Sequence, residues 1–556
     1  MSQDWPQEIP EVVRRWMTTL GFSTYADFED FQSFRLKDLA NPSDLKDMDL
    51  AVDRLIKAFE NKENICLYAD FDMDGTPGLA LLIRGLQYLG FQNLFSFQPD
   101  RFDHGYGVHA DIVEDFIDSH KVTLFVTVDV GITDVEAVRV AKEKGVDFII
   151  TDHHQQKEVL PEAYAIVNPN QKDCSSGLTY LCGTGVAFYL VLALRRKMKE
   201  IGLLQRDFDP KLLLDCFAIG TLTDMVPLVK ENRTLVQHGL LQLAKTQRKG
   251  LQKLMQELNL ANKRLGSTDV SIQLAPKLNA LTRMKWPVQP IDIFLVDNAR
   301  EAEEKVAEVM AAHQMRVEIQ RQGEEIVEAK LLEKDSWDHV FMWSERFHKG
   351  VVGLLANKTM QKLQVSSFMG AVLGDKVVGS GRAPDGMDLL PALDYASEFL
   401  VKFGGHRQAA GFELKLENAE AFSQKLAEFF SQQEKRVGPP PLVYDLHVSL
   451  PELNAEFMAW MKKLEPFGQG FPIPTLRLDH LFVGSAKVLK ERHLKFLLKD
   501  MHGHSIDALL FFADNIDELK SLSSKRVSVL AQPSINEYMG REKLQLLLKD
   551  IRVEFA

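Results

Sequence analysis

Three clusters of residues that could bind metal each follow a short apolar run typical of a buried strand. The clusters are Asp70-Phe71-Asp72-Met73-Asp74, Asp129 and Asp152-His153-His154, after the runs 65–69, 124–128 and 148–151. Because ligands bind outside the carboxyl ends of parallel strands in an open α/β sheet, we expect the clusters to converge on one crevice. Carboxylates and imidazoles suit hard divalent cations, so the sequence predicts a site for Mn²⁺ or Mg²⁺ there.

A pair of metal ions needs about five or six such ligands, including one carboxylate that bridges ions about 3.5–4 Å apart. Asp224, which follows an apolar run that we expect to be helical, completes this inventory. The candidate metal ligands are Asp72, Asp74, Asp129, His153 and Asp224. A single Asp at a strand end is more often a helix cap or a turn residue. Two histidines directly after an Asp favour a metal site, because a cap needs only one side chain.

The length and composition indicate a folded protein of several domains. With 556 residues the chain is too long for one hydrophobic core. Its first residues are acids and prolines rather than the basic start and apolar stretch of a signal peptide, so we expect a cytoplasmic location. The longest nearly apolar run, residues 181–194, is too short to span a bilayer. We therefore predict a buried helix there and no membrane role.

The net charge and the cysteines limit the chemistry. A formal net charge of −12 argues against a nucleic-acid partner, because basic residues dominate affinity for phosphates. Carboxylates gathered in a metal site weaken that argument, since bound cations would offset them. The four cysteines lack CxxC spacing and lie in or beside apolar segments, which indicates reduced core thiols. Any metal should therefore be held by oxygen and imidazole.

The order of predicted elements indicates an α/β protein with an added β-barrel. Residues 60–230 alternate apolar strands with helical patterns, which is typical of a parallel sheet. A charge-rich helical stretch covers about residues 299–333, and strands resume at Val340 in a second, smaller α/β domain. The prolines within residues 437–441 predict a linker. Strand-like runs at 444–449, 493–498 and 544–548 then indicate a small barrel.

Four ordered motifs resemble those of the DHH phosphoesterases. They are Asp70-x-Asp72-x-Asp74-Gly75, Val128-Asp129, Asp152-His153-His154 and Thr223-Asp224. Residues 404–411, which read GGHRQAAG, are similar to the GGHxxAAG signature of the DHH-associated second domain. Residues 466–470 and 544–546 lie where the RecJ single-strand-specific exonucleases carry similar runs in an OB-fold domain. The resemblance to the RecJ family covers about residues 50–555.

The resemblance implies five parts of the chain. They are an N-terminal helical segment (1–55), a parallel-sheet DHH phosphoesterase domain (56–295), a connecting helix (296–335), a smaller α/β DHH-associated substrate-binding domain (336–436) and a C-terminal OB-fold β-barrel (437–556). In the barrel, five aromatic residues are candidates for stacking on bases, of which we expect one or two to be exposed. These are Phe482, Phe496, Phe511, Phe512 and Tyr538.

The resemblance also implies a role for each candidate residue. The five candidate ligands would bind two Mn²⁺ or Mg²⁺ ions, with Asp129 as the bridge. Asp70 and His154 would orient ligands or the attacking water, and whether either touches metal is left open. The residues expected to hold substrate phosphates are Arg101, Arg283, Ser380, Arg382, Gly405 and His406. A guanidinium suits a phosphate, although a structural arginine bonded to carbonyls or carboxylates is the alternative for Arg101 and Arg283.

This chain departs from the family pattern at a few positions. Val130 and Phe471 stand where the family commonly has Asn, and Lys277, Leu281 and Thr282 replace the more usual Arg, Ala and Gly around Arg283. Every candidate metal ligand is nevertheless present. The resemblance therefore implies an active enzyme.

The function implied is a single-stranded-DNA-specific 5′ to 3′ exonuclease that hydrolyses phosphodiester bonds in DNA repair and recombination. Its substrate would be single-stranded DNA with a 5′ end, and a helicase and a single-strand-binding protein are candidate partners. The four-part architecture would suffice as a monomer. One alternative is a DHH-family phosphodiesterase acting on short oligonucleotides or cyclic dinucleotides, which would not need the barrel. The other is a non-catalytic nucleic-acid-binding protein, which would usually have lost metal ligands.

Overall fold

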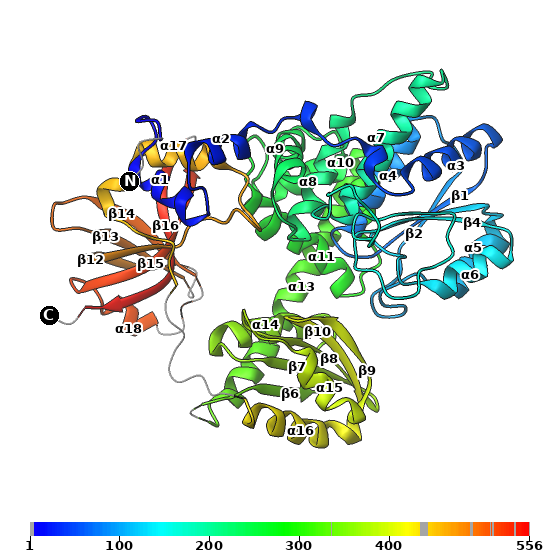
Figure 1. Ribbon diagram of the computed structural model, residues 1–556. Helices are drawn as coiled ribbons and strands as arrows, with labels where there is room; N and C mark the ends of the chain where they lie inside the picture. Colours follow the sequence, from blue (N-terminus) through cyan, green and yellow to red (C-terminus); the bar gives the residue numbers. More distant parts are fainter. Residues whose placement is uncertain are drawn as a thin grey trace.

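The computed structural model describes residues 5–334, 336–433, 443–489, 493–511, 513, 516–538 and 541–554. Within these ranges the chain forms two α/β domains joined by a long helix, and a β-barrel (Figure 1). The expected linker at 437–441 lies outside the described residues. The α/β class and the C-terminal barrel agree with the sequence-based expectation, whereas the five boundaries given above remain predictions.

A five-stranded parallel sheet in the order β2-β1-β3-β4-β5 forms the centre of the first domain. Its strands are β1 (Ile65–Ala69), β2 (Leu94–Phe97), β3 (Leu124–Val128), β4 (Asp147–Thr151) and β5 (Ala165–Val167). Alternate residues face opposite sides, so Leu67 and Val126 pack into one apolar core while Tyr68 and Phe125 pack into another. Because helices cover both faces, the strands read as continuous apolar runs.

The helices of the first domain divide between these two cores. The core that contains Tyr68 and Phe125 takes its helical residues from α5 (Ala110–His120) and α6 (Val135–Glu143). The larger core on the other side takes α3 (Met48–Asn61), α4 (Gly75–Tyr88), α7 (Gly183–Glu200), α8 (Leu214–Thr223), α9 (Lys230–Leu243), α10 (Lys249–Glu257), α11 (Ala275–Arg283) and α12 (Pro290–Leu295). The apolar run at 181–194 is thus the buried first part of α7, as predicted.

A single long helix, α13 (Ala299–Leu331), leads from the first domain to the second (Figure 1). The Asn298 side chain caps it by accepting from the backbone N–H groups of Arg300 and Glu301. The second domain has a mixed sheet in the order β6-β7-β8-β10-β9. Its elements are β6 (Val340–Ser344), α14 (Val352–Leu363), β7 (Ser367–Leu373), β8 (Lys376–Arg382), α15 (Leu390–Tyr395), β9 (Leu400–His406), β10 (Ala409–Lys415) and α16 (Ala419–Ser431).

The C-terminal domain is a closed barrel, because β12 pairs with both β13 and β15. Its elements are β11 (Leu446–His447), α17 (Ala455–Leu464), β12 (Leu476–Leu489), β13 (His493–Lys499), β14 (Ser505–Leu510), α18 (Ile516–Lys520), β15 (Arg526–Tyr538) and β16 (Arg541–Val553). The strand expected at 444–449 is shorter than predicted, since Ser449 already begins the 3-10 turn Leu450–Glu452.

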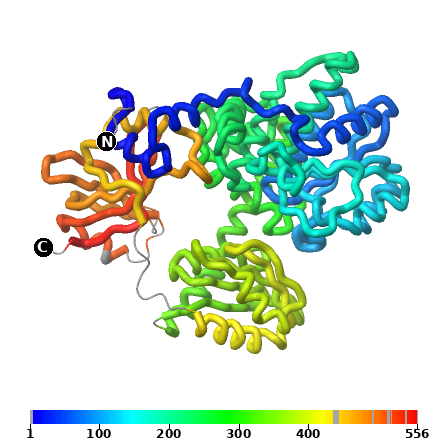
Figure 2. Tube along the Cα trace, viewed as in Figure 1, coloured from blue at the N-terminus to red at the C-terminus, as the bar shows by residue number. Residues whose placement is uncertain are grey.

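The N-terminal segment packs on the barrel domain (Figure 2). Trp16 of α1 (Glu11–Thr19) and Phe28 of α2 (Tyr25–Ser33) lie in the same apolar core as Phe457 and Phe471. Helix α3 belongs instead to the core of the first domain. Residues 5–55 therefore link the barrel domain to the first domain rather than forming a domain of their own. Among the described helices, none combines the length and apolar character needed to cross a membrane.

Candidate two-metal and phosphate site

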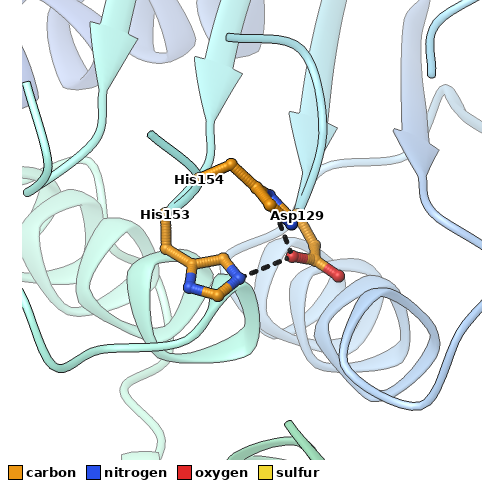
Figure 3. A group of neighbouring side chains, drawn as sticks. All are labelled: Asp129, His153 and His154. Carbon is orange, nitrogen blue, oxygen red and sulfur yellow. Dashed lines mark ion pairs between the residues drawn. The ribbon is translucent and has the colours of Figure 1, made fainter. Parts of the chain in front are cut away.

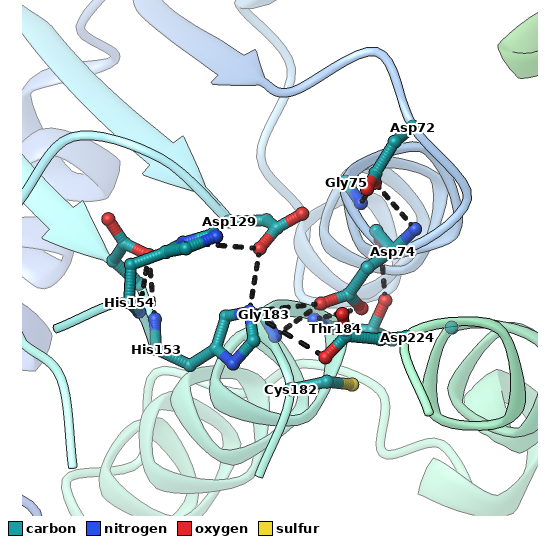
Figure 4. A network of polar contacts seen from close by, with 12 residues as sticks. Asp72, Asp74, Gly75, Asp129, His153, His154, Cys182, Gly183, Thr184 and Asp224 are labelled. Carbon is teal, nitrogen blue, oxygen red and sulfur yellow. Dashed lines mark hydrogen bonds and ion pairs between the residues drawn. The ribbon is translucent and has the colours of Figure 1, made fainter. Parts of the chain in front are cut away.

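Neighbouring parallel strands bring the three acidic clusters together, as the sequence predicted. Strands β1 and β3 pair so that Ala69 lies opposite Val128, and β4 pairs with β3 on its other side. The residues directly after these strands, Asp70, Asp129 and Asp152, are all buried. Figure 4 shows the side chains around Asp129 facing one space. Asp129 itself has a left-handed backbone (φ 63°), a strained conformation that recurs at functional sites.

Two helix N-termini hold the carboxylates of the first cluster. Asp72 Oδ1 accepts from the backbone N–H groups of Asp74 (2.8 Å) and Gly75 (3.0 Å), where α4 begins. The Asp74 carboxylate accepts from the N–H groups of Gly183 (2.6 Å) and Thr184 (2.9 Å), where α7 begins. Free N–H groups and the helix dipole favour negative charge at these positions. Both carboxylates are therefore fixed by backbone before any ligand binds.

Asp152 shapes the histidine pair rather than facing the shared space. Its Oδ1 accepts from the backbone N–H groups of His153 (2.7 Å) and His154 (3.0 Å) and lies 2.8 Å from His154 Nδ1. Its Oδ2 accepts from the N–H of Ile132 (2.9 Å). Both oxygens of this buried carboxylate are thus engaged within the protein. Figure 3 shows the result, with both imidazoles turned toward Asp129.

The imidazole of His153 stands at the centre of the predicted ligands. Its Nε2 lies 3.1 Å from Asp129 Oδ1 and 3.7 Å from oxygens of both Asp74 and Asp224. Candidate ligand atoms within 4.8 Å of one another fall into overlapping groups. These are Asp129 with His153 and His154, Asp74 with His153 and Asp224, and Asp70 with Asp72 and Asp129. Overlapping groups of this composition fit two divalent ions that share ligands.

Unpartnered carboxylate oxygens support that fit. Asp70 Oδ1, Asp129 Oδ1 and Asp224 Oδ2 are buried and have no hydrogen-bond partner among the described residues. A buried carboxylate oxygen without a hydrogen bond is costly, because the group loses its hydration and gains no hydrogen bond in return. Metal coordination would remove that cost at all three atoms. The donor set, oxygen and imidazole without thiolate, is the one that Mn²⁺ and Mg²⁺ accept.

The pKa values of the carboxyl groups reflect the same crowding of negative charge. Burial and the charge of Asp72 raise the pKa of Asp70 to about 8. Burial and the charge of Asp74 likewise raise the pKa of Asp224 to about 8 and that of Asp129 well above its usual range. Burial alone would lower the pKa of His154, but the hydrogen bond and charge of Asp152 outweigh it and raise that pKa to about 9. The crevice therefore favours the binding of cations.

Three of the predicted phosphate ligands gather where the two α/β domains meet. Arg283 ends α11 and donates to the carbonyl of Gly350 across the boundary (3.1 Å). Burial and the charges of Arg101, Arg316 and Arg382 lower the pKa of Arg283 to about 9. Arg101 stacks over the Phe71 ring at 4.7 Å, and its buried Nε has no partner in the described structure. Guanidinium groups whose charges lower the pKa of a buried neighbour in this way are suited to a shared anion.

The second domain contributes Arg382 and Ser380 from β8. Arg382 Nη1 donates to Ser380 Oγ (2.6 Å) and to the carbonyl of Gly381 (2.7 Å). Gly405 and His406 end β9, two strands away across β10, and both are exposed. Gly405 has φ 140° and no room for a side chain, since a Cβ would lie 2.5 Å from the carbonyl oxygen of Ala409. Among the described contacts, no hydrogen bond joins His406 to the arginines.

Several residues that shape the site are not among the predicted ones. Gly183 lets α7 begin against Asp129, because a Cβ there would lie 2.4 Å from the Asp129 Cβ. Gly220 of α8 has the same role, with a Cβ 2.9 Å from Asp74 Oδ1. The Tyr106 hydroxyl lies 3.2 Å from His154 Nδ1. Small residues at a helix start, as in Gly183-Thr184-Gly185, are the sequence signal that could have marked this region.

Comparison with known families divides the chain as the fold does. The DHH family, N-terminal domain, matches residues 64–221. The DHHA1 domain matches residues 338–432, and the RecJ OB domain matches residues 444–550. The first match contains the acidic clusters, the second contains Ser380, Arg382 and His406, and the third contains the barrel.

Similar proteins and structures extend over nearly the whole chain. "Single-stranded-DNA-specific exonuclease RecJ" of Salmonella typhimurium is 32% identical over 98% of this chain and 96% of its own length. The protein of the same name from Escherichia coli is 32% identical over 99% of this chain and 97% of its own length. A crystal structure of Thermus thermophilus RecJ in complex with Mn²⁺ matches with a TM-score of 0.79 and 26% identity, covering 99% of this chain and 77% of that one. Full-length identity of this extent, together with the shared fold, shows that the chain belongs to the RecJ family.

Proposed function

We propose that this protein is a single-stranded-DNA-specific exonuclease that degrades DNA from the 5′ end by hydrolysing one phosphodiester at a time. One observation carries the proposal: Arg101, Arg283 and Arg382, the arginine group, meet at the boundary of the first two domains, with Arg101 beside Asp70 and Asp72 of the acidic crevice. The relatives of this chain are named as such exonucleases. An acidic crevice suits metal-assisted hydrolysis, and arginines beside it suit a terminal phosphate.

The predicted ligands would hold two Mn²⁺ or Mg²⁺ ions. They are Asp72, Asp74, Asp129, His153 and Asp224, with Asp129 shared between the ions. Solved structures of Thermus thermophilus RecJ contain Mn²⁺ or Mg²⁺. Bound ions of this kind supply Lewis-acid stabilisation of the charge that develops on the phosphoryl oxygens. His154, whose pKa Asp152 raises to about 9, would offer a proton beside Asp129, and the buried Asp70 would orient the attacking water.

The arginine group would bind the 5′ phosphate and so select the strand end. Arg283 from the first domain and Arg382 from the second approach one another at the boundary, with Arg101 alongside. Ser380 would fix the Arg382 fork through the hydrogen bond that the structure contains. Gly405 and His406 would contact the strand from the exposed end of β9. A phosphate held beside the crevice would set which phosphodiester is cut.

The barrel would add affinity for single-stranded DNA by stacking bases on exposed aromatics. Phe482 and Phe511 are 40% and 49% exposed, whereas Phe496 is fully buried. Phe512 and the Tyr538 side chain lie outside the described residues. We propose a helicase and a single-strand-binding protein as partners, because DNA repair and recombination require access to single-stranded ends. The proposed oligomeric state is a monomer, and the proposed location is the cytoplasm.

The experiment that tests the proposal follows digestion of a single-stranded DNA oligomer labelled at its 3′ end and carrying a 5′ phosphate. A duplex copy and a 5′-blocked copy are digested in parallel, each with Mn²⁺ and with EDTA. We expect the unblocked single strand alone to shorten progressively from its 5′ end, and only with Mn²⁺.

Two outcomes would contradict the proposal. A blocked strand that disappears as fast as the free one would remove the 5′ end requirement. A long strand that survives while di- and trinucleotides are hydrolysed would favour the alternative, a DHH phosphodiesterase for short oligonucleotides or cyclic dinucleotides. The match of residues 444–550 to the RecJ OB domain favours the exonuclease, since small substrates do not need a barrel.

A further inference from the structure

Residues 464–471, which connect α17 to β12 in the barrel domain, lie against the loop that follows Asp224. We call residues 464–471 the docking segment. The backbone N–H of Leu228 donates to the carbonyl of Gln469 (2.8 Å). A Cβ on Gly468 would lie 2.8 Å from Leu228 Cδ1, so the Gly468 backbone packs directly against the Leu228 side chain. The barrel domain thus touches the chain four residues beyond a predicted metal ligand.

Arg233 of α9 anchors the docking segment. Its Nη1 donates to the carbonyl of Pro466 (2.9 Å) and its Nη2 to the carbonyl of Leu464 (2.7 Å). The guanidinium is 3% exposed and lies between two rings, 4.8 Å from the Phe31 centroid and 4.5 Å from that of Phe471. Two charge-assisted bonds and two ring contacts make this a well-defined contact between domains.

Further hydrogen bonds fix the segment along its length. Gln237 Nε2 donates to the carbonyl of Glu465 (3.1 Å). The N–H of Phe467 is shared between Ser267 Oγ (3.2 Å) and Glu465 Oε2 (3.1 Å). Because these bonds come from α9 and from the region before α11, the segment is held to the first domain at several points. Its carbonyl at Gln469 is therefore a fixed acceptor for Leu228.

The loop after Asp224 needs such support. Met225 and Lys230 both have left-handed backbones (φ 59° and 37°), a conformation that is strained for residues other than glycine. Met225 is 70% exposed and contributes little packing. Asn232 Nδ2 holds the loop from the inner side by donating to the carbonyl of Pro227 (3.0 Å). The docking segment holds it from the outer side, through Leu228.

We infer that the docking segment is a positioning element for Asp224, so that the barrel domain acts on the metal site directly as well as on DNA. Contact with Leu228 fixes the strained loop and sets the Asp224 carboxylate beside Asp74 and His153. The inference rests on the proposed function in taking Asp224 as a metal ligand. Groups that orient ligands from outside typically change metal affinity by about 10–100-fold when removed.

Substitution of Arg233 by Met tests the inference, because it removes both bonds to the segment while keeping much of the volume. Mn²⁺ binding is measured by calorimetry on the full-length protein, and binding of a 5′-phosphorylated single strand is measured in EDTA. We expect Arg233→Met to weaken the second Mn²⁺ by about 10–100-fold, with DNA affinity within about twofold of wild type. High Mn²⁺ should restore cleavage, and Arg233→Lys should restore part of the Mn²⁺ affinity.

Arg264→Met is the matched control, since Arg264 also joins the two domains by donating to a backbone carbonyl, that of Lys462 (2.8 Å), but away from Leu228. It should bind both Mn²⁺ ions normally. If Arg233→Met does not fold, Gly468→Ala replaces it, because the added methyl presses only on Leu228 and should weaken Mn²⁺ binding in the same way.

Two results would overturn the inference. One is unchanged Mn²⁺ binding in Arg233→Met or in Gly468→Ala. The other is equal loss of Mn²⁺ binding in Arg264→Met, which would mean that general contact between the domains matters. Asp224→Asn separates this failure from failure of the proposed function. If that variant also binds two Mn²⁺ ions as wild type does, then Asp224 is not a ligand and the metal assignment itself fails.

Discussion

The acidic crevice and the arginine group carry charges of opposite sign. In both, burial and neighbouring groups of like charge shift pKa values toward the neutral form. In the crevice, burial and neighbouring carboxylates raise the pKa values of Asp70 and Asp224 to about 8. In the arginine group, burial and neighbouring guanidinium groups lower the pKa of Arg283 to about 9. Each region holds like charges without enough counter-charge of its own. We infer that both regions are completed from outside, one by cations and the other by a phosphate.

The two regions differ in how they are assembled. The crevice is built within one domain, where strand ends and two helix N-termini fix the carboxylates through backbone hydrogen bonds. The arginine group draws on a loop, the end of α11 and a strand of the second domain. Its geometry therefore depends on contact between domains, such as the bond from Arg283 to Gly350. The metal site should tolerate a shift between the first two domains better than the phosphate site.

Asp129→Asn should have the largest effect, because Asp129 belongs to two of the overlapping ligand groups. We expect cleavage of single-stranded DNA to fall by roughly 10³-fold, as when a major source of transition-state charge stabilisation is removed. Mn²⁺ binding should weaken, while the metal-free protein should melt at a higher temperature because the crowded crevice loses a carboxyl group that is costly to bury. Asp118→Asn, on an exposed carboxylate that pairs with Lys144, is the control. A variant that keeps wild-type Mn²⁺ affinity would contradict the assignment.

Arg283→Met should affect the phosphate site and spare the metal site. We expect kcat/KM for a 5′-phosphorylated strand to fall by about 10–100-fold, which corresponds to about 1.5–3 kcal/mol for a bond to a charged group. A strand with a 5′ hydroxyl should lose much less, and calorimetry should find Mn²⁺ binding unchanged. Arg139→Met removes an exposed arginine that pairs with Glu136 and Glu143, and it should match wild type. Equal losses on both strands would show that Arg283 does not read the 5′ phosphate.

The pH dependence of stability should reverse when metal binds. With pKa values raised to about 8, Asp70 and Asp224 hold protons in the folded state that they release when unfolded. This contribution to stability is lost as the pH rises through about 8, so the EDTA-treated protein should melt at a higher temperature at pH 6 than at pH 8.5. Mn²⁺ displaces these protons, so its stabilising effect should grow with pH. Thermal melts that show the same pH trend with and without Mn²⁺ would contradict this prediction.

Loss of an exposed aromatic residue of the barrel should have the smallest effect on the enzyme, because base stacking involves neither the metal site nor the buried charges. Phe511→Ala should raise the Kd for single-stranded DNA by about fivefold, or about 1 kcal/mol, as loss of one stacked base does. Cleavage of a very short strand should be unchanged. Tyr164→Ala, on a tyrosine of the first domain with similar exposure, is the control for binding measured by fluorescence anisotropy. If Phe511→Ala and Tyr164→Ala behave alike, Phe511 does not stack on DNA.

Local pattern was enough to predict the acidic crevice. The apolar runs at 65–69 and 124–128 are β1 and β3 as expected, and the clusters after them converge because parallel strands end at one edge. Sequence reasoning placed Asp152 in the same cluster, but it could not assign its bonds to His153, His154 and Ile132. Those bonds depend on a turn geometry that side-chain types alone do not specify.

By itself the sequence determined the ligand types, their order at strand ends, the α/β class and the barrel, because these follow from periodicity and from motifs within short stretches of chain. The tertiary structure decided which distant groups meet. It placed Gly183 and Thr184 under Asp74, and it set Arg233 between Phe31 and Phe471. It also packed the N-terminal helices on the barrel rather than on the first domain. Such contacts depend on how whole elements pack, and packing sums many weak interactions that no short stretch of sequence contains.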